Sequence, residues 1–200
     1  HGMRWTMAKD ARRIILDEHR AVAAVLRSMR MMMAQGPGDA PERFFDVLRA
    51  MLFYIDEFPE RQHHPKESDL LFPKLARRAP ELMPVIDRLE REHMEGENRV
   101  RELQHLLLAW ELLGEERSQA FTEAASRYAD FYLAHMRLEE TDILPAAERL
   151  LSDEEWAELD KAFAAHVDPL AGTAARDPAY DRLFTRIVLK APAPIGVGPA

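Results

Sequence analysis

Apolar residues recur at helical spacing along almost the whole chain, and this periodicity restricts its fold more than any other feature. No segment alternates convincingly between apolar and polar residues, so we expect no strands. Clusters of glycine and proline interrupt the helical pattern at residues 35–41, and single breaks follow at Pro80 and Gly114. The pattern therefore predicts four long helices, at about residues 8–34, 41–75, 80–113 and 117–150.

Two prolines lie inside the second predicted helix. Pro59 and Pro65 each remove a backbone donor, so we expect a bend or a bulge there. After the fourth helix, Ser152 and Glu155 form a capping-box pattern that predicts a short fifth helix ending near residue 167. A weaker amphipathic segment follows at residues 180–189, and the final ten residues contain too much proline and glycine for a helix.

Four helices of similar length joined by short loops are typical of a helical bundle. We therefore predict an all-α fold, an antiparallel up-down-up-down four-helix bundle with a short C-terminal helical extension. The bundle and its short fifth helix should occupy residues 8–167. Residues 168–200 should form the extension and a flexible tail.

The composition excludes several classes of function. The chain contains no cysteine, so disulfides, thiolate catalysis and cysteine-held metals are ruled out. A formal net charge of −8 provides no basic field for nucleic acid. No apolar run is long enough to span a membrane, and no signal peptide precedes the first helix. We expect a cytoplasmic protein without nucleic-acid or membrane partners. A homodimer is one oligomeric state that the sequence allows.

Each of the four long predicted helices carries one histidine on its apolar stripe. A single histidine in such a place is more often a hydrogen-bonded core residue than a ligand. Four of them together are different, because a buried polar group without a partner costs roughly 1–3 kcal/mol. A shared metal ion would satisfy all four imidazoles at once. They are His19, His63, His93 and His135.

Three of these histidines are followed four residues later by a glutamate, and such pairs share one helix face. On a solvated face a pair of this kind is commonly only a surface hydrogen bond. On an apolar stripe it offers nitrogen and oxygen ligands that suit iron, manganese or zinc. Carboxylates can also bridge two metals, which makes a dinuclear site plausible. The pairs are His63 with Glu67, His93 with Glu97, and His135 with Glu139.

The motifs around these residues resemble the hemerythrin HHE cation-binding family over about residues 10–165. The resemblance implies an antiparallel four-helix bundle around a non-haem di-iron centre. It also implies that His19 and His63 bind one iron, that His93 and His135 bind the other, and that two carboxylates, Glu67 and Glu139, bridge them. The motifs are Glu18-His19-Arg20, residues 58–67 with Leu71-Phe72-Pro73, Glu92-His93, residues 135–140, and Leu144-Pro145.

The chain departs from the family pattern at two positions. Hemerythrin proper has a second histidine four residues after the third-helix histidine, where this chain has Glu97. A more anionic ligand set should favour ferric iron and disfavour simple reversible dioxygen carriage. Many relatives also have a second glutamate where this chain has Ser68. His64, which a bend at Pro65 could turn inward, is a further candidate ligand.

Three functions are compatible with these observations. The first is a protein that holds two carboxylate-bridged iron ions, or manganese or zinc in their place, and binds dioxygen or a related diatomic or peroxide ligand in sensing, storage or iron handling. The second is a di-iron oxidoreductase acting on peroxide or nitric oxide. The third is a metal-free helical interaction module. A ferritin-like di-iron site needs two Glu-x-x-His motifs, which end at His63 and His93, but it leaves His19 unexplained.

Overall fold

The structure, a computed structural model, describes residues 2–165, 168–171 and 177–199, with side chains described from residue 10 onward. Every regular element in these ranges is helical, which confirms the all-α prediction. The α-helices are α1 (Gly2–Gln35), α2 (Pro41–Ile55), α3 (His64–Lys66), α4 (Phe72–Arg78), α5 (Met83–Leu113), α6 (Ser118–Leu138), α7 (Leu144–Leu150), α8 (Asp153–Ala164) and α9 (Asp181–Lys190). The π-helical turns are η1 (Asp56–His63), η2 (Glu67–Leu71) and η5 (Glu139–Ile143), and the 3-10 turns are η3 (Pro80–Leu82), η4 (Glu115–Arg117) and η6 (Pro178–Tyr180).

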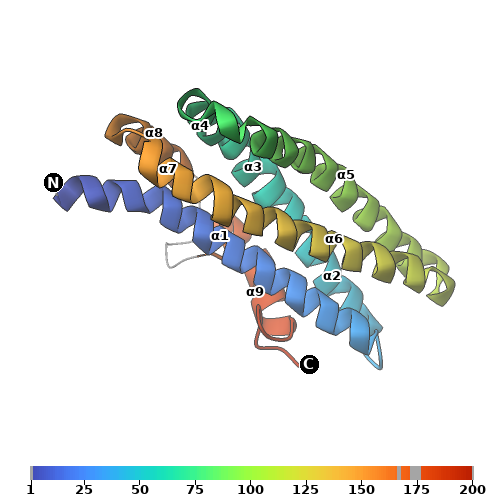
Figure 1. The fold of residues 1–200 in the computed structure, drawn as a ribbon. Coiled ribbons are helices and arrows are strands. Elements are labelled where there is room, and N and C mark those ends of the chain that lie inside the picture. Colours follow the sequence, from blue (N-terminus) through green and yellow to red (C-terminus); the bar gives the residue numbers. More distant parts are fainter. Residues whose placement is uncertain (1, 166–167, 172–176, 200) are drawn as a thin grey trace.

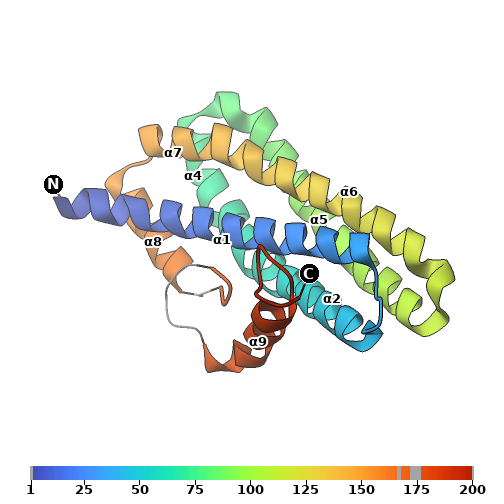
Figure 2. The same ribbon diagram turned by 90° about the horizontal axis from the view of Figure 1, so that it is seen from below.

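These elements join into four long helical rods. The first is α1, the second runs from α2 to α4, the third is α5, and the fourth runs from α6 to α7. Successive rods point in alternate directions (Figure 1), as the short connecting loops suggest. Helix α8 packs against α1, and α9 packs against α2 (Figure 2). Among the described helices, none combines the length and the apolar character needed to cross a membrane.

The expected irregularity in the second rod takes the form of two π-helical turns. Pro59 lies inside η1, where its missing N–H removes an α-helical hydrogen bond. A π-turn has more residues per turn than an α-helix, and such turns are frequent at functional sites. His63 ends η1, Glu67 begins η2 and Glu139 begins η5. Three candidate ligands of the second and fourth rods therefore lie in π-helical turns.

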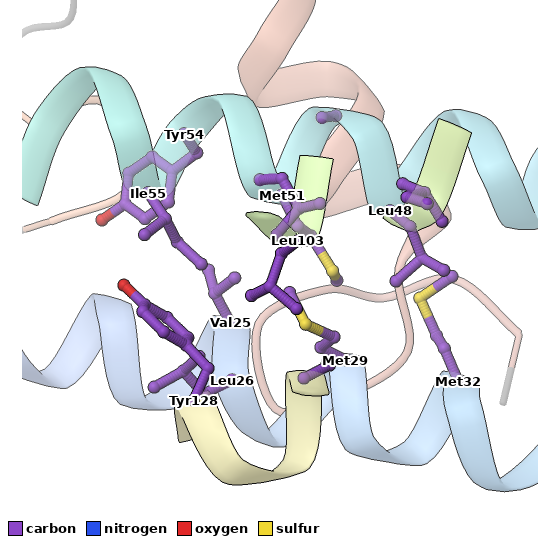
Figure 3. Packing of buried hydrophobic residues seen from close by; sticks show 14 of the residues in the cluster. Val25, Leu26, Met29, Met32, Leu48, Met51, Tyr54, Ile55, Leu103 and Tyr128 are labelled. Atoms are coloured by element: carbon purple, nitrogen blue, oxygen red, sulfur yellow. The ribbon is translucent and has the colours of Figure 1, made fainter. Parts of the chain in front are cut away.

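Two apolar layers enclose a polar layer in the middle of the bundle. One layer contains Met29, Met51, Tyr54 and Tyr128 (Figure 3). The other is built around Phe72 and continues against α8. Burial of apolar surface on both sides stabilises the bundle independently of the polar layer between them.

The C-terminal segments follow the prediction where the structure describes them. Ser152 and Glu155 form the capping box, with Glu155 N donating to Ser152 Oγ over 3.2 Å. The end expected for this helix, residues 166–167, lies outside the described residues. Helix α9 confirms the second amphipathic segment, and the chain after it is non-helical as far as residue 199. The division into a bundle and an extension remains a prediction.

Candidate metal centre

Six predicted ligands from the four rods meet in the polar layer. Each is at most 7% exposed, and each continues the inward-facing stripe of its rod. They are His19 of α1, His63 and Glu67 of the second rod, His93 of α5, and His135 and Glu139 of the fourth rod.

The two carboxylates lie between the histidines. Glu67 Oε2 is 3.2 Å from His63 Nε2, whereas Glu67 Oε1 is 3.3 Å from His93 Nε2. Each oxygen of this carboxylate therefore faces the imidazole of a different rod.

Glu139 has the same arrangement from the opposite rod. Its Oε2 is 3.1 Å from His19 Nε2, and its Oε1 is 2.6 Å from His135 Nε2 and 3.7 Å from His93 Nε2. Each glutamate therefore places one oxygen toward the histidine pair His19 and His63 and the other toward the pair His93 and His135.

Seven buried polar atoms of this cluster have no hydrogen-bond partner among the described residues outside it and face one another. They are the Nε2 atoms of His63, His93 and His135 and both carboxylate oxygens of Glu67 and Glu139. In the metal-free protein these contacts depend on protons carried by the imidazoles, and a metal ion bound between the same atoms would take the place of those protons. A donor set of imidazole nitrogens and carboxylate oxygens fits iron, manganese or zinc.

Two groups of four ligand atoms are each close enough together to hold an ion. In each group, the atoms lie within 4.8 Å of one another. Both groups contain Glu67, so two ions in these places would be neighbours. The first group is His19, His63, Glu67 and Glu139, and the second is His64, Glu67, His93 and His135.

The outward nitrogen of each histidine faces a polar group from another rod. An acceptor at Nδ1 fixes the N–H there and leaves the Nε2 lone pair free to face the centre. The distances to Nδ1 are 2.8 Å for Glu18 at His63, 2.9 Å for Glu92 at His135, 2.9 Å for the Ser68 hydroxyl at His93, and 3.8 Å for Glu140 at His19.

The sequence interpretation did not assign these outer partners. Glu18 and Glu92 each stand one residue before a predicted ligand but contact the histidine of a different rod. Ser68 was interpreted only as the loss of a carboxylate, whereas its hydroxyl contacts His93. The sequence signal that could have identified Glu18 and Glu92 is their position directly before a predicted ligand histidine.

Ion pairing controls the protonation of the metal-free cluster. Burial lowers the pKa of His135, but the negative charge and hydrogen bond of Glu139 outweigh this effect and raise that pKa to about 10. Burial also lowers the pKa of His63. The negative charges of Glu67 and Glu18 outweigh this effect and raise that pKa well above its usual value. Without metal, the centre therefore holds imidazolium–carboxylate pairs at neutral pH.

His64 also faces the interior and is only 5% exposed. Its Nδ1 lies 3.3 Å from Glu60 Oε2, and its Nε2 lies 2.9 Å from the Tyr132 hydroxyl. Its ring stacks on His93 with centroids 4.1 Å apart. Burial and the charges of His93, His63 and His135 lower the pKa of His64 well below its usual value, so this imidazole is neutral.

Glu60 is a buried carboxylate that lies in the 58–67 motif and is the glutamate of the Glu-x-x-His motif that ends at His63. It accepts a hydrogen bond from the Tyr128 hydroxyl at 3.4 Å, and burial raises its pKa to about 7. Space for it comes from Gly96, where a Cβ atom would lie 3.1 Å from Glu60 Oε1. The glycine of α5 and the glutamate of the second rod therefore fit together beside His64.

The structure corrects the prediction for Glu97. Its side chain is 49% exposed and pairs with Arg101 on the same helix face. The inward stripe of α5 continues from His93 to Gly96 and Val100, because three- and four-residue steps alternate along a helix of 3.6 residues per turn. The sequence prediction continued the stripe four residues after His93, at Glu97, whereas the buried position is three residues after it, at Gly96.

A comparison with known protein families identifies one family that matches this chain. The hemerythrin HHE cation binding domain matches residues 10–147, which contain all six converging ligands. The chain belongs to this family. A search of curated proteins found no match. For this hemerythrin-like chain, family membership and the buried histidine–glutamate groups together indicate a metal-binding protein.

Proposed function

We propose that this hemerythrin-like domain holds two iron ions bridged by Glu67 and Glu139. The main support for this proposal is that each carboxylate places one oxygen beside each histidine pair. A carboxylate that bridges two ions uses both oxygens in this way. A single ion would engage only one histidine pair and the oxygens that face it.

The terminal ligands follow from the same distances. His19 and His63 would bind the first ion, and His93 and His135 the second. His64 belongs to the second group of ligand atoms, so we assign it to the second ion. Glu97 has no role in this assignment, because its side chain lies on the surface.

When bound, a non-haem di-iron centre supplies redox capacity and a coordination position for a small ligand. The protein leaves no room for an organic substrate at this position. The hollow beside the centre is lined by Glu18, His19, Val22, Pro59, His63 and Tyr132 and is too small to hold even a water molecule. We therefore assign the coordination position to dioxygen or another small ligand, which these side chains would have to move to admit, in sensing, storage or iron handling.

Ligand addition to iron-loaded protein tests this function. We expect anaerobically reduced protein to show a saturable change in its near-ultraviolet and visible absorption when dioxygen or nitric oxide is added. Sustained consumption of hydrogen peroxide would instead favour the di-iron oxidoreductase. Iron-loaded protein that changes its spectrum with none of these ligands would contradict both functions.

Iron binding should release protons. Because the metal-free pKa of His135 is about 10, its ring carries a proton at pH 7 that must leave before Nε2 can bind metal. Apparent metal affinity should therefore rise with pH toward 10. Calorimetry in two buffers of different ionisation enthalpy should give different apparent heats. A His105→Ala variant, altered at an exposed position, should behave like wild type, and buffer-independent heats would contradict the assignment.

A further inference from the structure

A separate cavity of about 610 Å³ lies between α2, α5 and α9. This volume falls in the range of roughly 300–1,000 Å³ that is typical of small-molecule sites, which often lie between the helices of bundles. None of the proposed iron ligands lines this cavity. Any ligand of the cavity would therefore be distinct from the ligand of the metal centre.

The inner walls of the cavity are apolar. Leu52 and Leu107, which are 1% and 2% exposed, belong to the core and line its base. Phe53 and Leu108 also line it but are 47% and 49% exposed, and Leu183 of α9 lies opposite them on a different helix. Large apolar side chains exposed toward one hollow would lose contact with water if a hydrocarbon group filled it.

The other lining groups are mainly cationic. Arg49, Arg182 and Arg186 line the cavity together with one acidic residue, Asp46. Asp46 lies 3.7 Å from Arg49 and 3.6 Å from Arg186, and Arg49 also pairs with Glu111 of α5. Arg182 pairs with no acidic side chain in the described part of the chain. The cavity therefore has a local excess of positive charge in a protein whose net charge is −8.

Several contacts hold α9 in place and so fix the shape of the cavity. Ile187 on its inner face is fully buried in the bundle core. Tyr180, just before the helix, packs edge-to-face against Phe58 with ring centroids 4.8 Å apart. After the helix, the Ser28 hydroxyl donates to Pro192 O over 2.8 Å and accepts from Ile195 N over 3.0 Å. The cavity is thus formed by anchored elements.

We propose that this cavity binds an amphipathic carboxylate. Its hydrocarbon part would cover Phe53, Leu108 and Leu183, and its carboxylate would accept hydrogen bonds from Arg182 and Arg186. Arginine matches the planar geometry of a carboxylate and retains its charge at all physiological pH values. A singly charged head group suits a cavity where Asp46 and Glu111 already offset part of the arginine charge.

Titration calorimetry with decanoate on the 200-residue protein tests the proposal. We expect saturable binding of decanoate at one site and much weaker binding of decanol, which lacks the charge. Arg182→Gln should weaken decanoate binding by about tenfold, equivalent to about 1.4 kcal/mol. Arg77→Gln removes the same charge from an exposed position on α4 and should leave binding unchanged.

A second pair of variants tests the apolar wall. Leu108→Glu should abolish decanoate binding, whereas Leu112→Glu, one turn further along α5 and 70% exposed, should not. Both positions are exposed enough to keep the fold, which circular dichroism can verify. Absence of saturable binding, equal affinity for decanol, or equal effects of each variant and its control would overturn the proposal. Binding should not depend on metal, so its failure would leave the iron assignment untouched.

Discussion

Removal of metal should lower the melting temperature of this domain by about ten degrees. The expected size follows from binding to the native state alone, which contributes roughly 4 kcal/mol at a thousandfold excess over Kd, and 1 kcal/mol shifts a domain of this size by about 2–4 °C. The proposed ligands come from all four rods, so a bound metal would link elements that otherwise meet through apolar layers. Thermal melts with and without chelator measure the shift.

Two observations should accompany this shift. Chelated protein should remain mostly helical, because apolar layers lie on both sides of the centre. A His19→Ala variant has already lost one ligand and should respond less to chelator. Identical melting curves, on protein shown to have lost its metal, would mean that the centre does not link the rods.

The difference between the two melts should grow with pH. The folded pKa of His135 is raised from 6.5 to about 10, so its ion pair stabilises metal-free protein fully below about pH 6.5. That contribution is lost as pH rises through about 10. Metal binding strengthens over the same range because protons compete less. A constant difference from pH 7 to 9 would contradict the ion-pair account.

Replacing Glu139 with alanine should lower metal affinity by more than about a hundredfold. Even the outer partners of metal ligands typically contribute 10–100-fold, and Glu139 contacts histidines of both pairs. Glu97→Ala is the matched control, because it deletes the same side chain from a surface position. Its affinity should stay within about twofold of wild type. Titration with ferrous iron under anaerobic conditions measures both.

A folding defect must be separated from the loss of a ligand. Glu139→Gln retains the shape of the side chain but carries no charge, so it should also lose metal while keeping the helical content of wild type. Equal metal loss in Glu97→Ala and Glu139→Ala would show that the ligand roles are wrongly assigned.

The sequence contained enough information to bring most of the proposed ligands to the centre of the bundle. Helical periodicity aligned His19, His63, His93 and His135 on inward stripes, and local i,i+4 spacing added Glu67. These inferences depend on geometry within one helix, which is nearly constant from protein to protein. For the same reason, the bundle and the irregular second rod were predictable.

Other features of the site depend on contacts between rods. Glu60 fits beside His64 only because Gly96 of another rod leaves space, which no pattern within one helix encodes. The error at Glu97 has a related origin, since steps of three and four residues both continue a stripe and packing selects between them. The docking of α9 on α2 could not be predicted either, because its partner face lies far away in the sequence.

Iron content per chain tests the di-iron centre most directly. Protein reconstituted with iron under anaerobic conditions and freed of excess metal should contain about two iron atoms per chain by elemental analysis. After exposure to air, it should absorb in the near ultraviolet through charge transfer to iron. Glu97→Ala should retain this content. A single metal ion per chain in iron-replete protein, or zinc alone, would contradict the assignment of Glu67 and Glu139 as bridging ligands.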